Sequence, residues 1–385
     1  MSELSYLEKL LDGVKVEWLP LGNVTKYEQP TKYLVKAKDY HDTFSIPVLT
    51  AGKTFILGYT DETHGIYEAS KTPVIIFDDF TTANKWVDFD FKAKSSAMKM
   101  ITSSDDIKFS LKYVYYWLNT LPNELVDGDH KRQWISNYAQ KKVPVPCPDN
   151  PEKSLAIQSE IVRILDTFTA LTAELTAELT MRKKQYNYYC EQLLSFDDGG
   201  AEWKTLGELA ENLDAKRKPI TSGLREAGKI PYYGASGIVD YVKDYIFDGD
   251  FLLVSEDGAN LLARNTPIAF SISGKTWVNN HAHVLKFDTY AARRYVEYYL
   301  NSIDLTTYIS GAAQPKLNKK NLESIRIPNP PPEEKERIVS ILDKFDALTN
   351  SITEGLPREI ELRQKQYEYY RDMLFSFPKP EVAEA

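Results

Sequence analysis

The apolar residues of two long segments recur in alternating steps of three and four positions. One segment runs from Ile157 to Phe196 and the other from Ile338 to Phe377. This spacing puts the apolar side chains on one stripe of a helix, as at positions a and d of a coiled coil. Each segment follows a proline cluster, at 144–151 and 328–332, where a helix can begin. The pattern predicts two helices of about forty residues, each roughly 60 Å long.

The rest of the chain has a different texture. Residues 16–150 and 200–330 contain short runs of Val, Ile, Tyr, Phe and Trp separated by Gly, Pro, Asn and Asp, such as the run at 74–77. Runs of this kind are typical of β-strands joined by tight turns. A helical pattern occurs at least once in each part, near 111–118 and 291–300. We therefore expect an α+β fold with two β-rich domains.

The two domains and the two helical segments belong to an internal repeat. Residues 182–196 (RKKQYNYYCEQLLSF) recur as 363–377 (RQKQYEYYRDMLFSF), an offset of 363 − 182 = 181. Residues 165–172 recur as 342–349, an offset of 342 − 165 = 177. Because the matches are collinear and their offsets differ only slightly, we infer one duplicated unit with a pseudo-two-fold relation between its copies.

A third, partial copy lies at the start of the chain. Residues 6–11 (YLEKLL) match 189–194 (YCEQLL), and a Glu-Trp motif follows both. We interpret residues 1–15 as the end of a helical repeat that closes a ring with the far end of the chain. An ordinary amphipathic helix is the alternative. The remaining predicted segments are a central spacer helix at 151–199, a distal spacer helix at 331–378 and a tail at 379–385.

The distal spacer helix carries four residues more than the central one, and Gly355 and Pro357 lie among them. An interior proline removes a hydrogen bond and clashes with the preceding turn. We therefore expect a break at 354–357, whereas the central helix should be continuous.

The central helix contains a tandem of four residues, Thr172–Leu175 (TAEL) followed by Thr176–Leu179 (TAEL). Four inserted residues form a stutter in a heptad frame and lengthen a helix by about 6 Å without ending it. The tandem is either a length-setting element or a duplication that a tolerant helix accepted, and both interpretations stay open here.

Composition narrows the class of protein. No run of eighteen apolar residues occurs, and the first residues lack the pattern of a secretory signal, so we expect a cytoplasmic protein without a membrane span. Two cysteines in 385 residues exclude a disulfide framework and a four-thiolate zinc site. The net charge of −8 means that any nucleic-acid contact must use a local basic surface.

Two β-rich domains, each followed by a long helix with the pattern RxKQYxYYxxxLxSF, resemble the specificity subunit of type I restriction-modification systems. The TAEL tandem is similar to the spacer repeat of the IC subfamily. The resemblance implies two target-recognition domains separated by an antiparallel coiled coil of the two spacer helices. Each domain would read one half of a bipartite site in double-stranded DNA, while the helices set the gap between the halves.

The resemblance also implies the partners. Such a subunit is not catalytic and binds two methyltransferase (M) subunits, with restriction (R) subunits in the full complex. S-adenosylmethionine, ATP and Mg would then belong to the partner subunits, and we expect no cofactor or metal on this chain. The sequence agrees, because it has no phosphate-binding GxxxxGK[ST] motif, and His281-x-His283 has no third metal ligand at a recognisable spacing.

Base reading requires Arg or Lys for guanine, Asn or Gln for adenine and acidic groups for cytosine, on loops that reach a groove. Several polar loops follow strands at matched places in both domains, although solvated loops or loop-capping acids would look the same. The candidate DNA-binding residues are Lys53, Thr54, Asp79, Thr82, Asn84, Lys85, His130, Lys131, Arg132 and Gln133 in the first domain, and Tyr233, Ser236, Glu256, Asn260, Asn279, Asn280, His281, Gln314 and Lys316 in the second.

The nearly identical ends of the two spacer helices are the candidate partner surfaces. They are represented by Gln185, Tyr186 and Tyr189 in the central helix and by Gln366, Tyr367 and Tyr370 in the distal helix. A coiled-coil scaffold whose repeated β-domains bind protein or glycan is the competing interpretation, and only the DNA-recognition subunit should show salt-dependent, sequence-selective DNA binding.

Overall fold

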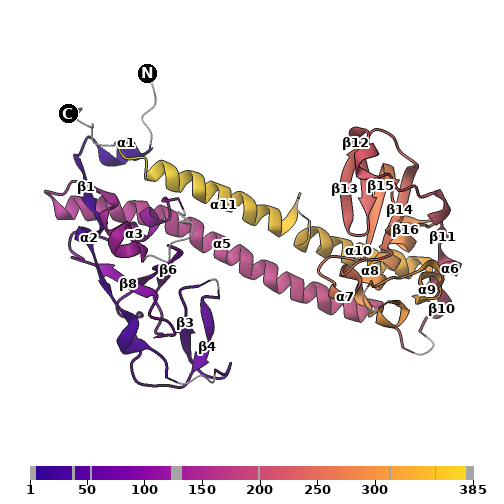
Figure 1. Cartoon of the computed structure of the whole chain (residues 1–385), viewed down its shortest axis with the longest axis horizontal. Helices are drawn as coiled ribbons and strands as arrows, with labels where there is room; N and C mark the ends of the chain where they lie inside the picture. Colours follow the sequence, from indigo (N-terminus) through magenta and orange to yellow (C-terminus); the bar gives the residue numbers. More distant parts are fainter. Residues whose placement is uncertain are drawn as a thin grey trace. The chain divides into compact units, whose positions relative to one another are not determined.

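The computed structural model describes residues 6–36, 40–52, 54–122, 132–197, 200–311, 314–351 and 353–378 (Figure 1). The chain divides into two compact units. Unit 1 combines residues 1–174 with 360–385, and unit 2 comprises residues 175–359. Each unit contains one β-rich domain together with part of the long helices. The predicted α+β fold class is therefore confirmed.

The domain of unit 1 is built around a four-stranded sheet with the strand order β2-β8-β5-β6. Strand β5 (Val74–Asp78) is buried at every position, which fits its continuous apolar run. A three-stranded sheet has the order β4-β3-β7, and β1 pairs with β9 in a separate ladder. The other elements of this part are α1 (Tyr6–Leu11), β1 (Val16–Pro20), α2 (Leu21–Val24), β2 (Thr25–Glu28), η1 (Pro30–Tyr33), β3 (Ile46–Leu49), β4 (Ile56–Thr60), β6 (Asn84–Val87), β7 (Lys92–Ala93), β8 (Met98–Ser103), α3 (Leu111–Leu118), α4 (Gln133–Ser136), η2 (Tyr138–Gln140) and β9 (Lys142–Pro146).

The domain of unit 2 contains one six-stranded sheet with the order β11-β16-β14-β15-β12-β13. Its strands pair antiparallel except β12 and β15, which run parallel. Strand β10 pairs with β17 outside this sheet. The elements are β10 (Glu202–Thr205), α6 (Leu206–Leu209), β11 (Glu211–Asn212), η3 (Asp214–Lys216), η4 (Ser222–Leu224), β12 (Ala227–Gly234), β13 (Gly237–Val242), β14 (Phe247–Ser255), α7 (Asn260–Ala263), β15 (Ala269–Val278), β16 (Ala282–Lys286), α8 (Tyr290–Ser302), η5 (Thr306–Tyr308), α9 (Lys319–Glu323) and β17 (Arg326–Asn329).

The two domains share a frame but differ inside it. In both, a two-stranded ladder (β1–β9 or β10–β17) joins the first and last strands of the domain, and an amphipathic helix (α3 or α8) precedes the last strand. Between these shared elements, unit 1 has sheets of four and three strands, whereas unit 2 has one sheet of six. The repeat in the sequence therefore corresponds to the frame, and the intervening strands are organised differently.

The distal spacer helix is interrupted. Helix α10 (Pro332–Thr349) ends before α11 (Gly355–Leu374) begins, so the interruption starts after Thr349 and overlaps the predicted position at 354–357 only at Glu354. Pro357 lies in the first turn of α11, where amides have no intrahelical partner and a missing N–H costs little. Gly355 turns the chain with a φ of +76°, a left-handed value that favours glycine.

The central spacer helix, α5 (Pro151–Leu194), is continuous. Along its length, α3 and its cap meet Gln158 and then Asp166 of α5. In the same direction along α3, Tyr113 contacts Phe375 and Tyr116 contacts Tyr367 of the C-terminal segment. In unit 1 the first part of α5 and the last part of α11 therefore run antiparallel.

The two ends of the chain contribute to one core in unit 1. Leu7 and Leu11 of α1 are buried in the same cluster as Leu374, Phe375 and other residues of the domain. In addition, the indole N–H of Trp18 donates a hydrogen bond to the carbonyl oxygen of Pro378 at 2.8 Å. Residues near the start of the chain are thus held by residues that follow α11.

Among the residues that the structure describes, none of the helices combines the length and apolar character needed to cross a membrane.

Replacing Gly355 by alanine is expected to destabilise the junction between α10 and α11 by about 1–2 kcal/mol from the left-handed backbone alone. A further cost arises because the new Cβ would come within 2.3 Å of the Ala347 carbonyl oxygen. Urea unfolding followed by circular dichroism measures the loss. Gly223→Ala is the control, because an added Cβ there meets nothing within 4 Å. Equal unfolding midpoints for the two variants would contradict the assignment.

Candidate nucleic-acid interface

Four loops of unit 2 converge at one edge of the six-stranded sheet. They are the β12–β13 turn, the segment after β14, the β15–β16 turn and residues 310–311 with 314–317. The amide of Glu256 donates to the carbonyl of His281 at 2.9 Å, and the amide of Leu317 donates to the carbonyl of Glu256 at 2.8 Å. The Ser255 hydroxyl donates to the Ala235 carbonyl, which attaches the first turn to the same edge. Sequence positions from 233 to 317 are thereby brought together.

Two basic side chains on this edge already have acidic partners. The Lys316 ammonium lies 3.1 Å from a Glu256 carboxylate oxygen. The His281 Nδ1 lies 2.9 Å from an Asp257 carboxylate oxygen, and the imidazole is half exposed. Three further predicted residues, Ser236, Asn280 and Gln314, are exposed on these loops.

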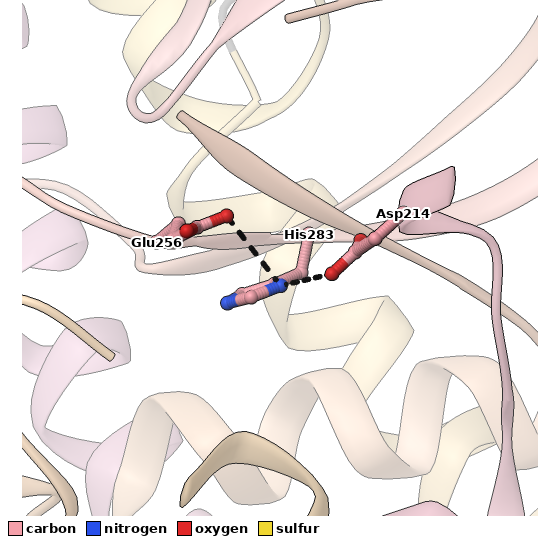
Figure 2. Close-up of side chains that lie close together, drawn as sticks. All are labelled: Asp214, Glu256 and His283. Atoms are coloured by element: carbon pink, nitrogen blue, oxygen red, sulfur yellow. Dashed lines mark hydrogen bonds and ion pairs between the residues drawn. The ribbon is translucent and has the colours of Figure 1, made fainter. Parts of the chain in front are cut away.

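A charged network lies directly beneath the edge (Figure 2). The His283 ring is buried, with Nδ1 2.6 Å from an Asp214 carboxylate oxygen and Nε2 2.7 Å from the Leu317 carbonyl oxygen. Each ring nitrogen therefore lies within hydrogen-bond distance of an oxygen acceptor. Arg217 donates to Glu256 at 2.6 Å and to the Ala282 carbonyl at 2.8 Å. The network joins the segment 214–217 and His283 of β16 to Glu256, the residue that directly follows β14.

Burial by itself raises the pKa of the Asp214 and Glu256 carboxyls, but the positive groups around them reverse this effect. For Asp214 the hydrogen bond and charge of His283 contribute most to the lowering. For Glu256 the hydrogen bond from Arg217 leads, followed by the charge of His283. The pKa of each carboxyl is therefore below its ordinary value, and both groups stay ionised near neutral pH.

Asp214, Glu256 and His283 place potential metal-ligand atoms within 4.8 Å of one another. The arrangement does not suit a metal, because Nδ1 of the imidazole is already engaged by Asp214 and Nε2 by the Leu317 carbonyl oxygen. Arg217 also binds Glu256 at 2.6 Å and lies 3.3 Å from Asp214, so it occupies the carboxylates. These residues form a salt-bridge network.

Three predicted base-reading residues of unit 2 have structural roles instead. Glu256 is only 12% exposed and lies between Arg217 and Lys316, so its carboxylate has no free edge to offer a base. Asn260 hydrogen-bonds both the amide and the carbonyl of Thr266 and closes a loop. Asn279 is buried and accepts from the His281 amide at 2.8 Å, which shapes the β15–β16 turn. Tyr233, at the end of β12, is partly buried against Phe270.

In unit 1 the predicted residue Asp79 is buried and holds the start of α4. Its backbone carbonyl accepts from the Gln133 amide at 2.8 Å, and its carboxylate accepts from the Trp134 amide at 2.8 Å. The buried ammonium of Lys99 lies 3.4 Å from the same carboxylate. Asp79 therefore cannot read a base from this position, but it positions Arg132, the exposed residue immediately before α4.

The other candidates of unit 1 fall into three groups. Gln133 and Thr82 are buried, and Thr82 adopts a left-handed φ of 61°, which is strained for a β-branched residue. Asn84 is partly buried, whereas Thr54, Lys85 and Arg132 are exposed. The predictions for Lys53, His130 and Lys131 lie outside the described residues.

The candidate partner surfaces also need one correction. Tyr186 is partly buried and Tyr367 packs against Tyr116, because both belong to the apolar stripes of their helices. The most exposed aromatic residues of the matched segments are instead Tyr188 and Tyr369, at 57% and 66% exposure. They lie off the stripe within the same YxYY motif, and a helical projection of that motif identifies them.

Each of these exposed tyrosines forms an edge-to-face pair with the next residue. The ring centroids of Tyr188 and Tyr189 are 5.5 Å apart at 74°, and those of Tyr369 and Tyr370 are 5.4 Å apart at 78°. Gln185 and Gln366, one turn earlier, are exposed as well. The two repeats thus present the same aromatic arrangement, one in each unit.

The sequence analysis missed Arg217, Asp214 and Asp257. Asp214 begins η3 and Arg217 directly follows it, 39 residues before its partner Glu256, and nothing in the local sequence marks either residue. Asp257 is adjacent to Glu256 in the polar segment after β14, and its place in that segment could have identified it as a candidate.

Comparisons with known proteins agree with these features. The model of the family "type I restriction modification DNA specificity domain" matches residues 200–362. The chain is 62% identical over 405 aligned positions to the specificity subunit of the Escherichia coli type I restriction enzymes EcoR124I/EcoR124II, covering 99% of both chains. It is 30% identical to a putative type I specificity subunit of Haemophilus influenzae, covering 97% of this chain and 98% of that protein. A crystal structure of an S subunit from M. genitalium has a similar fold, with a TM-score of 0.65, 16% identity and coverage of 96% and 98%.

Replacing Asp214 by asparagine is expected to lower the free energy of unfolding at pH 7 by about 1.5–3 kcal/mol, because the carboxylate binds charged partners in a buried site. The folded-state pKa of Asp214 is lowered, so its contribution is present above the unfolded pKa and is lost as the pH falls through the folded pKa. The difference between wild type and variant should therefore shrink below about pH 4. Urea unfolding at pH 7 and pH 3 measures it.

The control is Asp240→Asn, which removes an exposed pair with Arg225 in the same unit. Its loss should be smaller than that of Asp214→Asn at pH 7. A difference between wild type and Asp214→Asn that does not change with pH would show that the network is not charged as described.

Proposed function

Because this chain belongs to the family of type I restriction-modification specificity subunits, we propose that its two domains each read one half of a bipartite site in double-stranded DNA. The subunit itself is not catalytic. The observation that carries the proposal is the shared frame around differently organised strands, with sheets of four and three strands in one domain and of six in the other. Because both domains share this frame, they can bind equivalent positions on DNA. Their loops differ, so the two domains can contact different bases.

The proposed reading surface of unit 2 is the loop edge that carries Ser236, Asn280, His281, Gln314 and Lys316. These side chains offer a hydroxyl, amides, an imidazole and an ammonium, the groups that bind base edges and phosphates. In unit 1 the proposed surface includes Thr54, Lys85 and Arg132, with the predictions for Lys53, His130 and Lys131 retained. We place Glu256 and Asp79 among the residues that position these surfaces.

The proposed partners are two methyltransferase subunits, with restriction subunits in the full complex. The matched aromatic pairs Tyr188–Tyr189 and Tyr369–Tyr370 support two equivalent docking sites, because paired exposed tyrosines are typical of protein interfaces. S-adenosylmethionine, ATP and Mg are then held by the partner subunits. We propose that the chain acts in the cytoplasm and that the TAEL tandem places it in the IC subfamily.

Family membership sets aside the alternative of a scaffold that binds protein or glycan. We infer that the spacer helices have two tasks, which are to set the gap between the half-sites and to dock the methyltransferase subunits. The TAEL tandem supports the first task, because residues 172–179 contribute to neither domain core and can change in length without disturbing either one.

Arg132→Ala tests the reading surface of unit 1. With methyltransferase partners present, binding to the selected DNA site should weaken by roughly 1–3 kcal/mol, with relaxed preference at one position if Arg132 reads a guanine. If it contacts phosphate, affinity should fall evenly across sequences, with a smaller dependence on salt. Arg163→Ala on α5 removes the same charge outside the candidate loops and is the control. Wild-type affinity and wild-type specificity of Arg132→Ala would exclude this residue from the surface.

Deleting Thr176–Leu179 tests the spacer. The deletion should leave both half-sites unchanged and alter the preferred gap by about one base pair, less than a rigid 6 Å would give because a coiled coil can adjust its winding. Selection from DNA with randomised gap lengths measures the preference. Scrambling the same four residues at constant length is the control and should leave the gap unchanged. An unaltered gap in the deletion variant would reject the proposed role of the tandem.

A further inference from the structure

One aspartate on the central spacer helix receives two side chains from the domain of unit 1. The Tyr116 hydroxyl of α3 donates to one carboxylate oxygen of Asp166. The Lys112 ammonium, one turn earlier on α3, lies 2.9 Å from the other oxygen. A tyrosine and a basic residue thus hold both oxygens of a single carboxylate on α5.

Unit 2 repeats this arrangement with its own residues. The Tyr298 hydroxyl of α8 donates to Asp343 of α10 at 2.6 Å, and the Arg294 Nε donates to the same carboxylate oxygen at 3.0 Å. The domain residues are related by an offset of 298 − 116 = 182, and the aspartates by 343 − 166 = 177. The second offset equals that of the repeat at 165–172, and the first differs by one from the offset of 181 found for the repeat at 182–196. The same contact therefore occurs twice, from equivalent positions, and we name it the aspartate clamp.

The chemistry makes each clamp a directed contact. Burial, followed by the hydrogen bond to the aspartate, raises the pKa of Tyr116, so its hydroxyl remains a donor. Burial contributes most to the raised pKa of Tyr298 as well. Hydrogen bonds to a carboxylate are about twice as strong as neutral ones, and an ion pair adds to each.

A directed contact fixes register where apolar packing does not. Besides the clamp, the side chain of Gln158 on α5 accepts a hydrogen bond from the amide of Ser110, the cap of α3, at 2.9 Å. The rest of the contact between α3 and α5 is made mostly by apolar and aromatic side chains in one cluster. Apolar surfaces tolerate sliding, whereas the partly buried polar groups of the clamp are satisfied in one register only. One helical turn is 5.4 Å, which exceeds the rise of roughly 3.4 Å per base pair. A slip of a domain along its spacer helix by one turn would therefore exceed one base pair.

We propose that Asp166 and Asp343 are positioning residues that fix each domain on its spacer helix and so limit the number of base pairs accepted between the half-sites. This rests on the proposed function, in which each domain reads one half-site. The aspartates touch no DNA in this arrangement. Their effect is on the gap between the half-sites, and the bases read within each half-site do not depend on them.

The two clamps differ in how much supports them. In unit 2, Arg294 also pairs with Glu297 at 2.6 Å and with Asp346 at 3.1 Å. The Tyr290 hydroxyl donates to the second oxygen of Asp343 at 2.7 Å. In unit 1, no acid other than Asp166 pairs with Lys112 within the part of the chain that the structure describes. Loss of Asp166 should therefore disturb register more than loss of Asp343.

The test uses the full chain assembled with its methyltransferase partners and duplexes that carry the selected half-sites. In these duplexes the gap between the half-sites has either the preferred length or a length that differs from it by one base pair. For Asp166→Asn, the ratio of affinities for the preferred and altered gaps should fall about tenfold, the size expected from one charge-assisted contact. For Asp343→Asn the fall should be smaller, and base preference within each half-site should be unchanged in both variants.

Controls separate positioning from general stability. Glu334→Gln removes an exposed ion pair with Arg337 on α10 and should keep the wild-type ratio. Lys112→Arg introduces the basic residue found in the clamp of unit 2 and should also keep the wild-type ratio of affinities. If Asp166→Asn does not fold, Lys112→Gln removes the half-exposed partner and should lower the ratio in the same direction.

The outcomes are distinguishable. A wild-type complex with no preference for a bipartite site would reject the proposed function itself. A wild-type complex that prefers such a site, with variants that keep the gap ratio while their melting temperature falls, would show that the clamp is merely structural. Altered base preference within a half-site would also overturn the proposal, because it would place the effect on reading.

Discussion

The whole of unit 1 depends on the apolar stripe of α5, because the same side chains close the domain core and meet the last helix. Ile157, Ile161 and Leu165 are buried in one cluster with residues of α3 and with Leu374. In unit 2 the stripe of α10 has the same double use, since Ile338 and Leu342 are buried in the core of that domain. Each spacer helix is therefore part of the hydrophobic core of its domain. The position of the helix then determines the position of the loops of that domain.

The electrostatics of the loop edge follow a related logic. The chain has a net charge of −8, and the basic groups at the edge of unit 2 are paired with Glu256 and Asp257. Pairing keeps the local field weak, which lowers attraction to phosphate in general. The DNA contacts proposed for this edge would have to replace these existing pairs, so good geometry would count for more than charge alone.

The sequence predicted the long helices and the repeated frame, but it did not predict which polar residues are buried in the site. Periodicity identified the long helices because it reflects burial on one stripe, and the repeat identified the frame because both copies kept it. The break in the distal helix was misplaced because proline is tolerated in a first turn, where Pro357 lies. Asp79 and Glu256 were assigned to DNA because an acid after a strand looks the same whether it faces solvent or a buried cation. That distinction depends on Lys99 and Arg217, which come from other elements.

The shared core of the two chain ends has a consequence for biosynthesis. Unit 2 is one continuous stretch, 175–359, so all its core residues have been synthesised before α11 is complete. Unit 1 includes Leu374, Phe375 and Phe377, which the ribosome adds hundreds of residues after Leu7. The domain translated first is therefore the one that completes its core last, the reverse of the usual N-terminal-first order. A nascent chain that stops before α11 would therefore leave the core of the early domain incomplete, while the later domain already contains all its core residues.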